Sequence, residues 1–356
     1  MKIHKNRLLI VGSGNIFKKH ISVLNNLTDR YEIVGIVEKN LKKLSKLKKK
    51  FKYQIFSNVD KAIKNSRFDL GCILTESGSH AELAFKFLNN KKSIIVEKPI
   101  SISLRDAKKI VELENKNRKL KIFVVKQYRF NLAIQKLKSA VDKQKLGKIF
   151  LATVRVRWKR DHKYYKSASW RGTWKNDGGV LCNQAIHHID LLQWLVGEVE
   201  SVFCSSNTVL APIESEDTAV GILNFKNKAI GNIEATTAVR PDNIEGSITL
   251  MGTKGTVIIG GFSADKVNLW RIIKSKNYNE KELIKLENPK KVYAYSHQKF
   301  YEYVFKNLKN RNKNFLNAKE AIKSLKIVTA LVKSSSSKKL VKLSENLFNT
   351  KLGKKN

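Results

Sequence analysis

The stretch from Gly178 to Asp190 brings the residue types of a proton-transfer site into otherwise apolar surroundings. Asn183 and His187 stand four residues apart, and His187 and Asp190 stand three apart, so a helix would carry all three on one face. An imidazole ionises near neutral pH and is the natural base for taking a proton from an alcohol. The alternative interpretation is a histidine that is satisfied within the protein core.

A metal centre at the same residues is not expected. His187 and His188 are adjacent, and neighbouring side chains on a helix point about 100° apart, so both do not easily face one ion. The sequence also contains no Cys-x-x-Cys and no His-Glu-x-x-His spacing.

The segments that must position such a site begin with a strand, a glycine turn and a helix. Residues 7–11 are apolar and are followed by Gly12-Ser13-Gly14-Asn15-Ile16 and an amphipathic stretch that ends near residue 27. In a dinucleotide-binding fold the first glycine permits the turn, and Gly14 lets the backbone approach a pyrophosphate at the helix N-terminus. Phe17 replaces the third glycine of the usual fingerprint, so this motif alone is weak support.

An acid at the end of the second strand strengthens this interpretation. Residues 31–37 are apolar and end at Glu38, where a carboxylate can accept hydrogen bonds from the ribose hydroxyls of the adenosine. The same charge would repel a 2′-phosphate, so the sequence favours NAD over NADP. Lys39 weakens this preference, because it could pair with such a phosphate.

Strand and helix patterns then alternate through residue 125, which predicts a doubly wound parallel sheet of the Rossmann type. Ligands of such sheets bind at the carboxyl ends of the strands. Three loops fall at that edge, at residues 12–16, 75–80 and 97–99. The residues that we expect to bind the cofactor are Gly12, Gly14, Asn15, Ile16, Glu38, Thr75, His80, Glu97 and Lys98.

Glu97-Lys98-Pro99 directly follows a buried strand, at residues 93–96. Alone it would be a solvated turn, but at the edge of a dinucleotide-binding sheet its lysine can reach a substrate hydroxyl. With this tripeptide, the glycine turn and the later Gly-Gly…His…Asp segment, the chain resembles the glucose–fructose oxidoreductase and inositol dehydrogenase (Gfo/Idh/MocA) family over essentially its whole length. The resemblance implies an NAD(P)-dependent sugar dehydrogenase.

A narrower resemblance lies in the second half. The segments at residues 126–131, 156–160 and 170–174 (Trp-Arg-Gly-Thr-Trp), with Asn183-Gln184 before His187, are similar to the UDP-N-acetylglucosaminuronic acid 3-dehydrogenases. These enzymes oxidise the sugar 3-hydroxyl of a nucleotide sugar on the way to surface polysaccharides. Many members of the wider family carry Asp where this chain has Asn183, whereas this subgroup has the amide.

The chemistry implied is hydride transfer from an alcohol carbon to NAD, with one group taking the hydroxyl proton and a second holding the oxygen. We assign these catalytic roles to His187 and Lys98, and the residues leave open which of the two accepts the proton. Guanidinium groups suit a diphosphate or a carboxylate, and aromatic rings suit a uracil or a sugar, although ordinary packing is equally expected for any one ring. The expected substrate-binding residues are Gln127, Arg129, Asn183, Arg160, Tyr165, Arg171 and Asp190.

The second half predicts an α+β domain with a large, open and mostly antiparallel sheet, because seven segments between residues 150 and 271 alternate or are rich in β-branched residues. Met251-Gly252-Thr253-Lys254-Gly255-Thr256 is a strong hairpin signal. A helix is expected at residues 318–332, followed by a polar exit at Ser334 to Ser337. The expected domains are residues 1–126, which bind NAD, and residues 127–356, which bind substrate and mediate oligomerisation. The family resemblance implies a homodimer or a homotetramer.

Composition indicates a globular cytoplasmic protein. No apolar run approaches the roughly 20 residues that span a bilayer, no signal peptide is recognised, and three scattered cysteines are typical of a reducing compartment. The net charge of +40 comes from 70 Lys and Arg against 30 Asp and Glu. Because the lysines are spread over the whole chain, we interpret the charge as a background enrichment and expect no nucleic-acid or membrane partner.

Two rival functions remain open from the sequence alone. Within the same fold, the chain could oxidise a free sugar or a cyclitol, or act as a glycosidase with tightly held NAD. From another class, it could be a Rossmann protein that binds nucleotides or nucleic acid without catalysis. The presence of both Lys98 and His187 argues against the second rival.

Overall fold

A computed structural model describes residues 4–117, 119–273, 292–309 and 316–354. The chain forms two compact units, and each is described by itself. The first consists of Met1–Ser101, Arg105–Lys126 and Ser296–Ile322, and the second of Ile102–Leu104, Gln127–Tyr295 and Lys323–Asn356. The division into domains at residue 126 stays a prediction about which parts fold independently.

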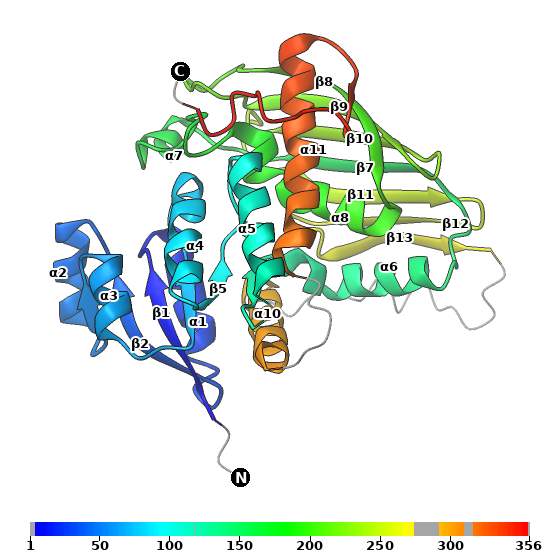
Figure 1. The fold of residues 1–356 in the computed structure, drawn as a ribbon. Coiled ribbons are helices and arrows are strands. Elements are labelled where there is room, and N and C mark those ends of the chain that lie inside the picture. Colours follow the sequence, from blue (N-terminus) through cyan, green and yellow to red (C-terminus); the bar gives the residue numbers. More distant parts are fainter. Residues whose placement is uncertain (1–3, 118, 274–291, 310–315, 355–356) are drawn as a thin grey trace. The chain divides into compact units, whose positions relative to one another are not determined.

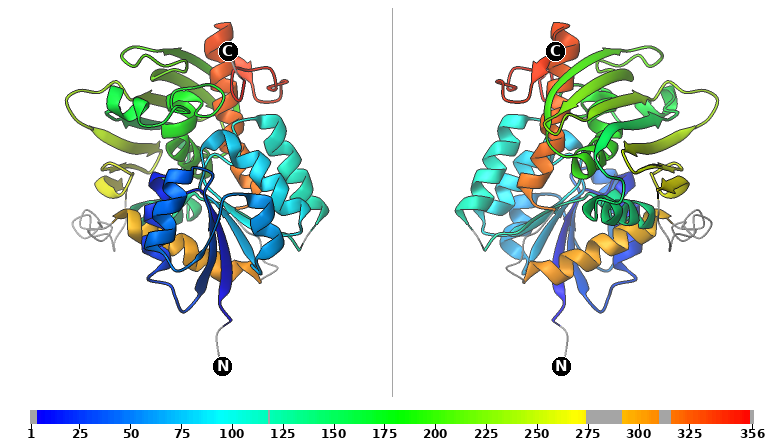
Figure 2. Two further views of the ribbon diagram at one scale, coloured as in Figure 1. Left: turned by 90° about the vertical axis from the view of Figure 1, so that its left-hand side faces the viewer. Right: turned by 90° about the vertical axis from the view of Figure 1, so that its right-hand side faces the viewer.

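The first unit contains a six-stranded sheet in the order β3-β2-β1-β4-β5-β6, and all of its paired strands are parallel. The strand order reverses between β1 and β4, where doubly wound sheets bind their ligands. Helices lie on both faces of this sheet (Figures 1 and 2). The strands are β1 (Asn6–Val11), β2 (Tyr31–Val37), β3 (Gln54–Phe56), β4 (Leu70–Ile73), β5 (Ser93–Val96) and β6 (Ile122–Val124).

The helices of this unit bury apolar stripes against the sheet. In α1, Phe17, Ile21 and Leu24 are buried at helical spacing, and in α10 the buried residues include Phe300 and Val304. Asn40 caps α2 by accepting a hydrogen bond from the backbone of Lys43. The helices are α1 (Asn15–Leu24), α2 (Leu41–Lys50), α3 (Val59–Asn65), α4 (His80–Asn89), α5 (Leu104–Lys116) and α10 (Val292–Leu308), with the short helix η1 (Ser77–Ser79).

The second unit contains an eight-stranded sheet in the order β13-β12-β11-β7-β10-β9-β8-β14. Its pairs are antiparallel except for β7 with β10. The predicted hairpin is confirmed, since Gly252 of β11 faces Gly255 of β12. The strands are β7 (Ile149–Arg157), β8 (Val199–Asn207), β9 (Thr218–Phe225), β10 (Ile230–Thr236), β11 (Glu245–Gly252), β12 (Gly255–Gly260), β13 (Lys266–Ile272) and β14 (Val341–Lys342).

Among the described residues of this unit, helices cover one face of the sheet. A Cβ on Gly221 of β9 would come within 2.8 Å of Leu331, so α11 packs closely against that face. The alternate residues Val220 and Ile222 point to the other face and are each 49% exposed. The helices of this unit are η2 (Gln127–Phe130), α6 (Leu132–Asp142), α7 (His162–Lys166), the π-helical η3 (Val180–Gln184) and α8 (Ile186–Val196), and α11 spans Ala318–Ser337.

The expectation of a polar exit at Ser334–Ser337 is wrong, because α11 continues through Ser337. Ser334 is fully buried, and its hydroxyl accepts a hydrogen bond from the backbone N–H of Cys204 at 2.9 Å and donates to the carbonyl of Lys339 at 2.6 Å. A serine that satisfies both hydrogen-bonding roles in this way is compatible with a packed helix. Among the described helices none is both long and apolar enough to cross a bilayer.

Candidate active site

The glycine turn after β1 leaves room for a phosphate. Gly12 has a φ of +97°, and a Cβ there would lie 2.8 Å from Cγ2 of Thr75, so the turn requires glycine. A Cβ on Gly14 would meet nothing within 4 Å, which leaves open space directly before α1. Asn15 and Ile16 form the first turn of that helix, whose free N–H groups favour an anion.

Glu38 is held beside this turn. Its carboxylate accepts hydrogen bonds from the backbone N–H and the hydroxyl of Ser13 and from the backbone N–H of Asn40. Its role in binding the ribose hydroxyls stays a prediction. The ammonium of the neighbouring Lys39 lies 2.7 Å from the carboxylate of Glu76, so the cation that could receive a 2′-phosphate already has a partner.

His80 joins two of the predicted cofactor loops. Its Nδ1 lies 2.7 Å from the carbonyl oxygen of Pro99 and its Nε2 lies 3.1 Å from that of Thr75. Burial lowers the pKa of His80, while the two carbonyls oppose this effect. The ring therefore ties the loop after β4 to the loop that carries Lys98, and it is buried between them.

Glu97 is a buried carboxylate at the end of β5. Its Oε1 lies 3.0 Å from Nε2 of His20, and its Oε2 accepts a hydrogen bond from the backbone N–H of Lys98 at 3.1 Å. Burial by itself would raise the pKa of Glu97, but the hydrogen bond and charge of His20, with His297 and Lys98, lower it to about 2. Lys98 itself is half-buried.

In the second unit, the catalytic histidine predicted from the sequence lies in α8. The ring of Tyr128 stacks on His187 with centroids 4.5 Å apart, and Nε2 of Gln127 lies 3.3 Å from Nε2 of His187. Tyr128 and Gln127 therefore hold the imidazole of His187 from two sides, through ring stacking and through this polar contact.

Asn183 does not share a continuous α-helix with His187, contrary to expectation. It lies in the π-helical turn η3, which follows Gly178 and Gly179 at φ values of +79° and +77° and precedes α8. Its amide donates to the buried carboxylate of Asp177. The spacing rule failed because it assumes regular α-helical geometry, whereas π-turns recur at functional sites.

Arg129 and Asp190 form a buried ion pair that the sequence did not reveal. The guanidinium donates to both carboxylate oxygens, at 2.7 and 2.9 Å, and its side chain is fully buried. One helical turn, η2, thus supplies three successive partners: Gln127 and Tyr128 for His187, and Arg129 for Asp190. Asp190 is bound to Arg129, so the pair supports α8 from within the protein.

A second cluster, formed by Arg160, Arg171 and Tyr164, contacts η3 through Gln184. The guanidinium of Arg171 lies 4.1 Å from the ring centroid of Tyr164 and donates to its hydroxyl. Arg160 lies 5.2 Å from the same ring and donates to Oε1 of Gln184 at 3.2 Å. Tyr165, in contrast, is buried, and its hydroxyl lies 2.9 Å from that of Thr237.

Sequence reasoning missed several buried polar residues around these sites. Glu216 accepts a hydrogen bond from the backbone N–H of Leu181 in η3, and His20 and His297 surround Glu97. A signal was present for the histidines, because His20 lies at helical spacing among the buried residues of α1. For Glu216 the only signal was the resemblance of the run Glu216-Asp217-Thr218-Ala219 to the narrower subgroup, which assigned no role to its carboxyl.

Two family descriptions match the chain. "Oxidoreductase family, NAD-binding Rossmann fold" matches residues 6–125, and "Oxidoreductase family, C-terminal alpha/beta domain" matches residues 138–343; both belong to the Gfo/Idh/MocA models. These matches confirm the predicted family, its two-part fold class and the use of NAD.

Solved structures and a sequence relative agree with these matches. The WlbA dehydrogenase of Bordetella pertussis, solved with NADH and UDP-GlcNAcA, is 32% identical, with 96% of this chain and 100% of that chain covered and a TM-score of 0.87. The WlbA dehydrogenase of Chromobacterium violaceum, solved with the same ligands, is 30% identical, with 97% and 98% covered and a TM-score of 0.89. Myo-inositol 2-dehydrogenase of Thermotoga maritima is 25% identical over 95% of this chain and 99% of its own length. The chain therefore belongs to the Gfo/Idh/MocA oxidoreductase family and is an NAD-dependent dehydrogenase.

Proposed function

We propose that this protein oxidises a secondary hydroxyl of a nucleotide sugar, namely C3 of a UDP-N-acetyl-hexosamine or of its uronic acid, in the biosynthesis of surface-polysaccharide sugars. The observation that carries the proposal is the similarity over nearly the whole chain to two WlbA dehydrogenases solved with UDP-GlcNAcA. The arginine and aromatic cluster around Tyr164 supports it, because such groups suit a diphosphate and a ring.

Lys98 and His187 are the proposed catalytic residues. NAD, when bound, accepts the hydride from the alcohol carbon. The ammonium of Lys98 holds the alcohol oxygen and stabilises the negative charge that develops on it. His187 accepts the hydroxyl proton at Nε2, the ring atom that lies 3.3 Å from the amide nitrogen of Gln127. The ring of Tyr128 fixes the plane of the imidazole.

The remaining substrate-binding residues fall into two proposed roles. Arg160, Arg171 and Asn183 contact the substrate, the arginines through its anionic groups. Arg129 and Asp190 keep α8 in place, because both are buried and paired to each other. Tyr165 supports α7, the helix that also carries Tyr164, through its hydrogen bond with Thr237.

Oxidation of a free sugar or cyclitol is the second candidate. It is favoured by the similarity to myo-inositol 2-dehydrogenase of Thermotoga maritima over 95% of this chain. A cyclitol carries no diphosphate, so this candidate leaves Arg160 and Arg171 without an anionic ligand.

A single-turnover assay separates the two candidates. Purified protein loaded with NAD is mixed with UDP-GlcNAcA, UDP-GlcNAc, myo-inositol or glucose 6-phosphate, and the absorbance of NADH is followed. We expect reduction with a UDP-sugar, and a KM for it that rises about tenfold in Arg171→Lys, because a lysine cannot form the bidentate contact. Reduction by myo-inositol alone, with an unchanged rate in Arg171→Lys, would show that the nucleotide-sugar proposal is wrong.

We further propose that the protein acts in the cytoplasm as a homodimer or homotetramer that pairs through the uncovered face of the second sheet. Large apolar side chains are exposed there on neighbouring strands, namely Phe203, Val220, Ile222 and Ile230. In sedimentation experiments Ile222→Lys should shift the protein toward monomer, whereas the surface change Lys226→Glu should not. A monomeric wild-type protein would contradict this part of the proposal.

A further inference from the structure

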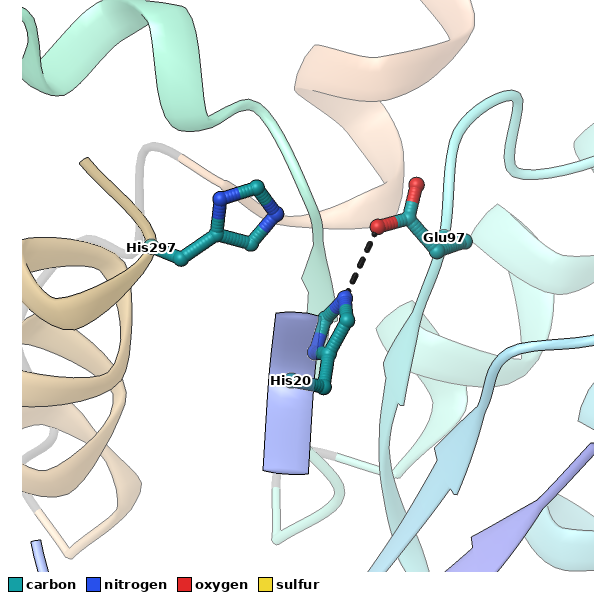
Figure 3. A group of neighbouring side chains, drawn as sticks. All are labelled: His20, Glu97 and His297. Atoms are coloured by element: carbon teal, nitrogen blue, oxygen red, sulfur yellow. Dashed lines mark hydrogen bonds and ion pairs between the residues drawn. The ribbon is translucent and has the colours of Figure 1, made fainter. Parts of the chain in front are cut away.

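Three buried side chains of the first unit meet beside Lys98 without having a role in the chemistry described above. They are His20 of α1, Glu97 at the end of β5 and His297 of α10, and one ligand atom of each lies within 4.8 Å of the others (Figure 3). The segments that carry them are far apart in the sequence. Such a cluster serves either to bind a cation or to hold a buried charge.

The hydrogen bonds of the cluster form one line from Cys72 to Glu97. Burial raises the pKa of Cys72 to about 12 and that of Tyr301 well above 10, so both groups keep their protons. The hydroxyl of Tyr301 lies 3.6 Å from the sulfur of Cys72 and 2.7 Å from Nδ1 of His20. In the neutral tautomer of His20 that donates from Nε2 to Glu97, Nδ1 accepts from Tyr301, which leaves the thiol to donate to Tyr301; the other carboxylate oxygen accepts from the backbone of Lys98.

This chain of donors favours a buried anion over a metal ion. Both ring nitrogens of His20 and both oxygens of Glu97 already have protein partners, so an ion would have to displace the bond of 3.0 Å between them. The titratable groups that face Glu97 include Cys72 and Tyr301, which keep their protons, and His20, His297, His80 and Lys98, each of which stabilises a carboxylate when protonated.

We propose that Cys72, Tyr301, His20 and His297 form a positioning network that holds Glu97 as a permanent anion. Through this anion, the network fixes the position of Lys98 and favours its protonated form. Glu97, expected from the sequence to bind the cofactor, acts instead through Lys98. Hydrogen bonds in such a chain polarise one another, so the loss of a distant member weakens the whole. The proposal rests on the proposed function, in which Lys98 stabilises the reacting oxygen.

The chain offers a matched pair of variants. Tyr301→Phe removes the hydroxyl that donates to His20. Tyr31→Phe removes another buried hydroxyl, which donates to the backbone carbonyl of Tyr301 at 2.6 Å and does not touch His20. Both changes cost α10 a buried hydrogen bond, so general loosening of that helix affects them alike. Glu97→Gln removes the charge and keeps the size of the side chain.

The test measures the amine of Lys98 directly. Purified protein is acetylated briefly over a range of pH, and the labelling of the Lys98 peptide is quantified by mass spectrometry, which needs neither NAD nor substrate. Because loss of a nearby anion makes the ammonium less favourable, we expect the labelling midpoint to fall by about one pH unit in Glu97→Gln. Tyr301→Phe should shift it in the same direction and lower kcat about tenfold, whereas Tyr31→Phe should match the wild type in both.

Two outcomes would overturn the inference. One is an unchanged Lys98 midpoint in Glu97→Gln, or equal behaviour of Tyr301→Phe and Tyr31→Phe. The other is about one metal ion per chain in the purified protein that is lost in His297→Ala. If instead the labelling shifts as expected but no sugar is oxidised, the network stands and the proposed function is the part that fails.

Discussion

Each unit buries a glutamate beside the segment that carries its proposed reactive group, but the two carboxyls are in opposite states. Glu97 keeps its charge, because His20 outweighs the effect of burial and the pKa falls to about 2. Burial raises the pKa of Glu216 to about 8, and the nearby groups that act on it include Asp177 and Asp217 rather than cations. The first unit thus places an anion beside its proposed reactive segment, whereas the second places a neutral acid beside η3 and an Arg129–Asp190 ion pair on α8.

The difference follows from what each segment must provide. Lys98 stands on a strand end, where a backbone N–H can be fixed by a carboxylate. In the proposed mechanism His187 stays neutral to act as a base, and an unpaired anion next to it would favour the imidazolium, whereas Asp190 is paired with Arg129. A protonated Glu216 below η3 accepts from the backbone of Leu181 without adding that charge.

The largest effect is expected from removing either reactive group. Lys98→Met and His187→Asn should each lower kcat by about 10³- to 10⁴-fold and leave NAD affinity unchanged, because each group contributes mainly in the transition state. Steady-state kinetics and NAD titration measure both.

Neighbouring residues provide the controls for these variants. His188→Asn alters the next histidine, which packs against Trp158, and Lys92→Met alters a lysine at the start of β5; both should keep most of the activity. Wild-type rates in Lys98→Met or His187→Asn would show that the residues are wrong.

The contributions of Glu216 and Glu97 to the free energy of unfolding should change with pH in opposite directions. The folded-state pKa of Glu216 is raised from 4.5 to about 8, so its stabilising effect is complete below pH 4.5 and is lost as the pH rises through 8. The loss amounts to about 4 to 5 kcal/mol at most. Glu97 has a lowered pKa, so its contribution is present above pH 4.5 and is lost as the pH falls toward 2.

Glu216→Gln isolates this effect, because an amide has the shape of the neutral acid and does not titrate. Its free energy of unfolding should exceed that of the wild type increasingly from pH 6 to pH 9. Tryptophan fluorescence during chemical denaturation reports on the correct unit, since all five tryptophans lie in the second unit, at positions 158, 170, 174, 194 and 270. A constant difference across this range would mean that Glu216 is ionised in the folded protein.

The Arg129–Asp190 ion pair on α8 should contribute about as much to the free energy of unfolding as Glu216 does. Arg129→Met leaves the carboxylate of Asp190 buried without its guanidinium, so the free energy of unfolding should fall by about 3 to 5 kcal/mol. The double change Arg129→Met with Asp190→Leu should recover much of this loss by replacing the pair with apolar groups. Full stability of Arg129→Met in denaturation experiments would contradict a structural role for the pair.

The contrast between the units also explains what could be predicted from the sequence. The cofactor unit is built on backbone features that leave local signals: Gly12 and Gly14 mark a turn, and Glu38 ends an apolar strand. The spacing of Asn183 and His187 was misleading, because a π-turn has no signature that distinguishes it from an α-helix in one sequence. The pairing of Arg129 with Asp190 joins residues 61 positions apart, and no local pattern reports such a contact.

The smallest effect is expected at the exposed edge of the first unit, where charges are weakly coupled. Glu76→Gln releases Lys39, whose ammonium lies 2.7 Å from the Glu76 carboxylate and which is largely exposed. The freed cation can then approach a 2′-phosphate, so the ratio of kcat/KM for NADP to that for NAD should rise about threefold. Glu38 still repels the phosphate, which keeps NAD the better cofactor, and added salt near 0.5 M should remove most of the gain because it screens exposed charges. An unchanged ratio at low salt would mean that Lys39 does not reach the 2′-position, and that Glu38 alone sets the preference for NAD.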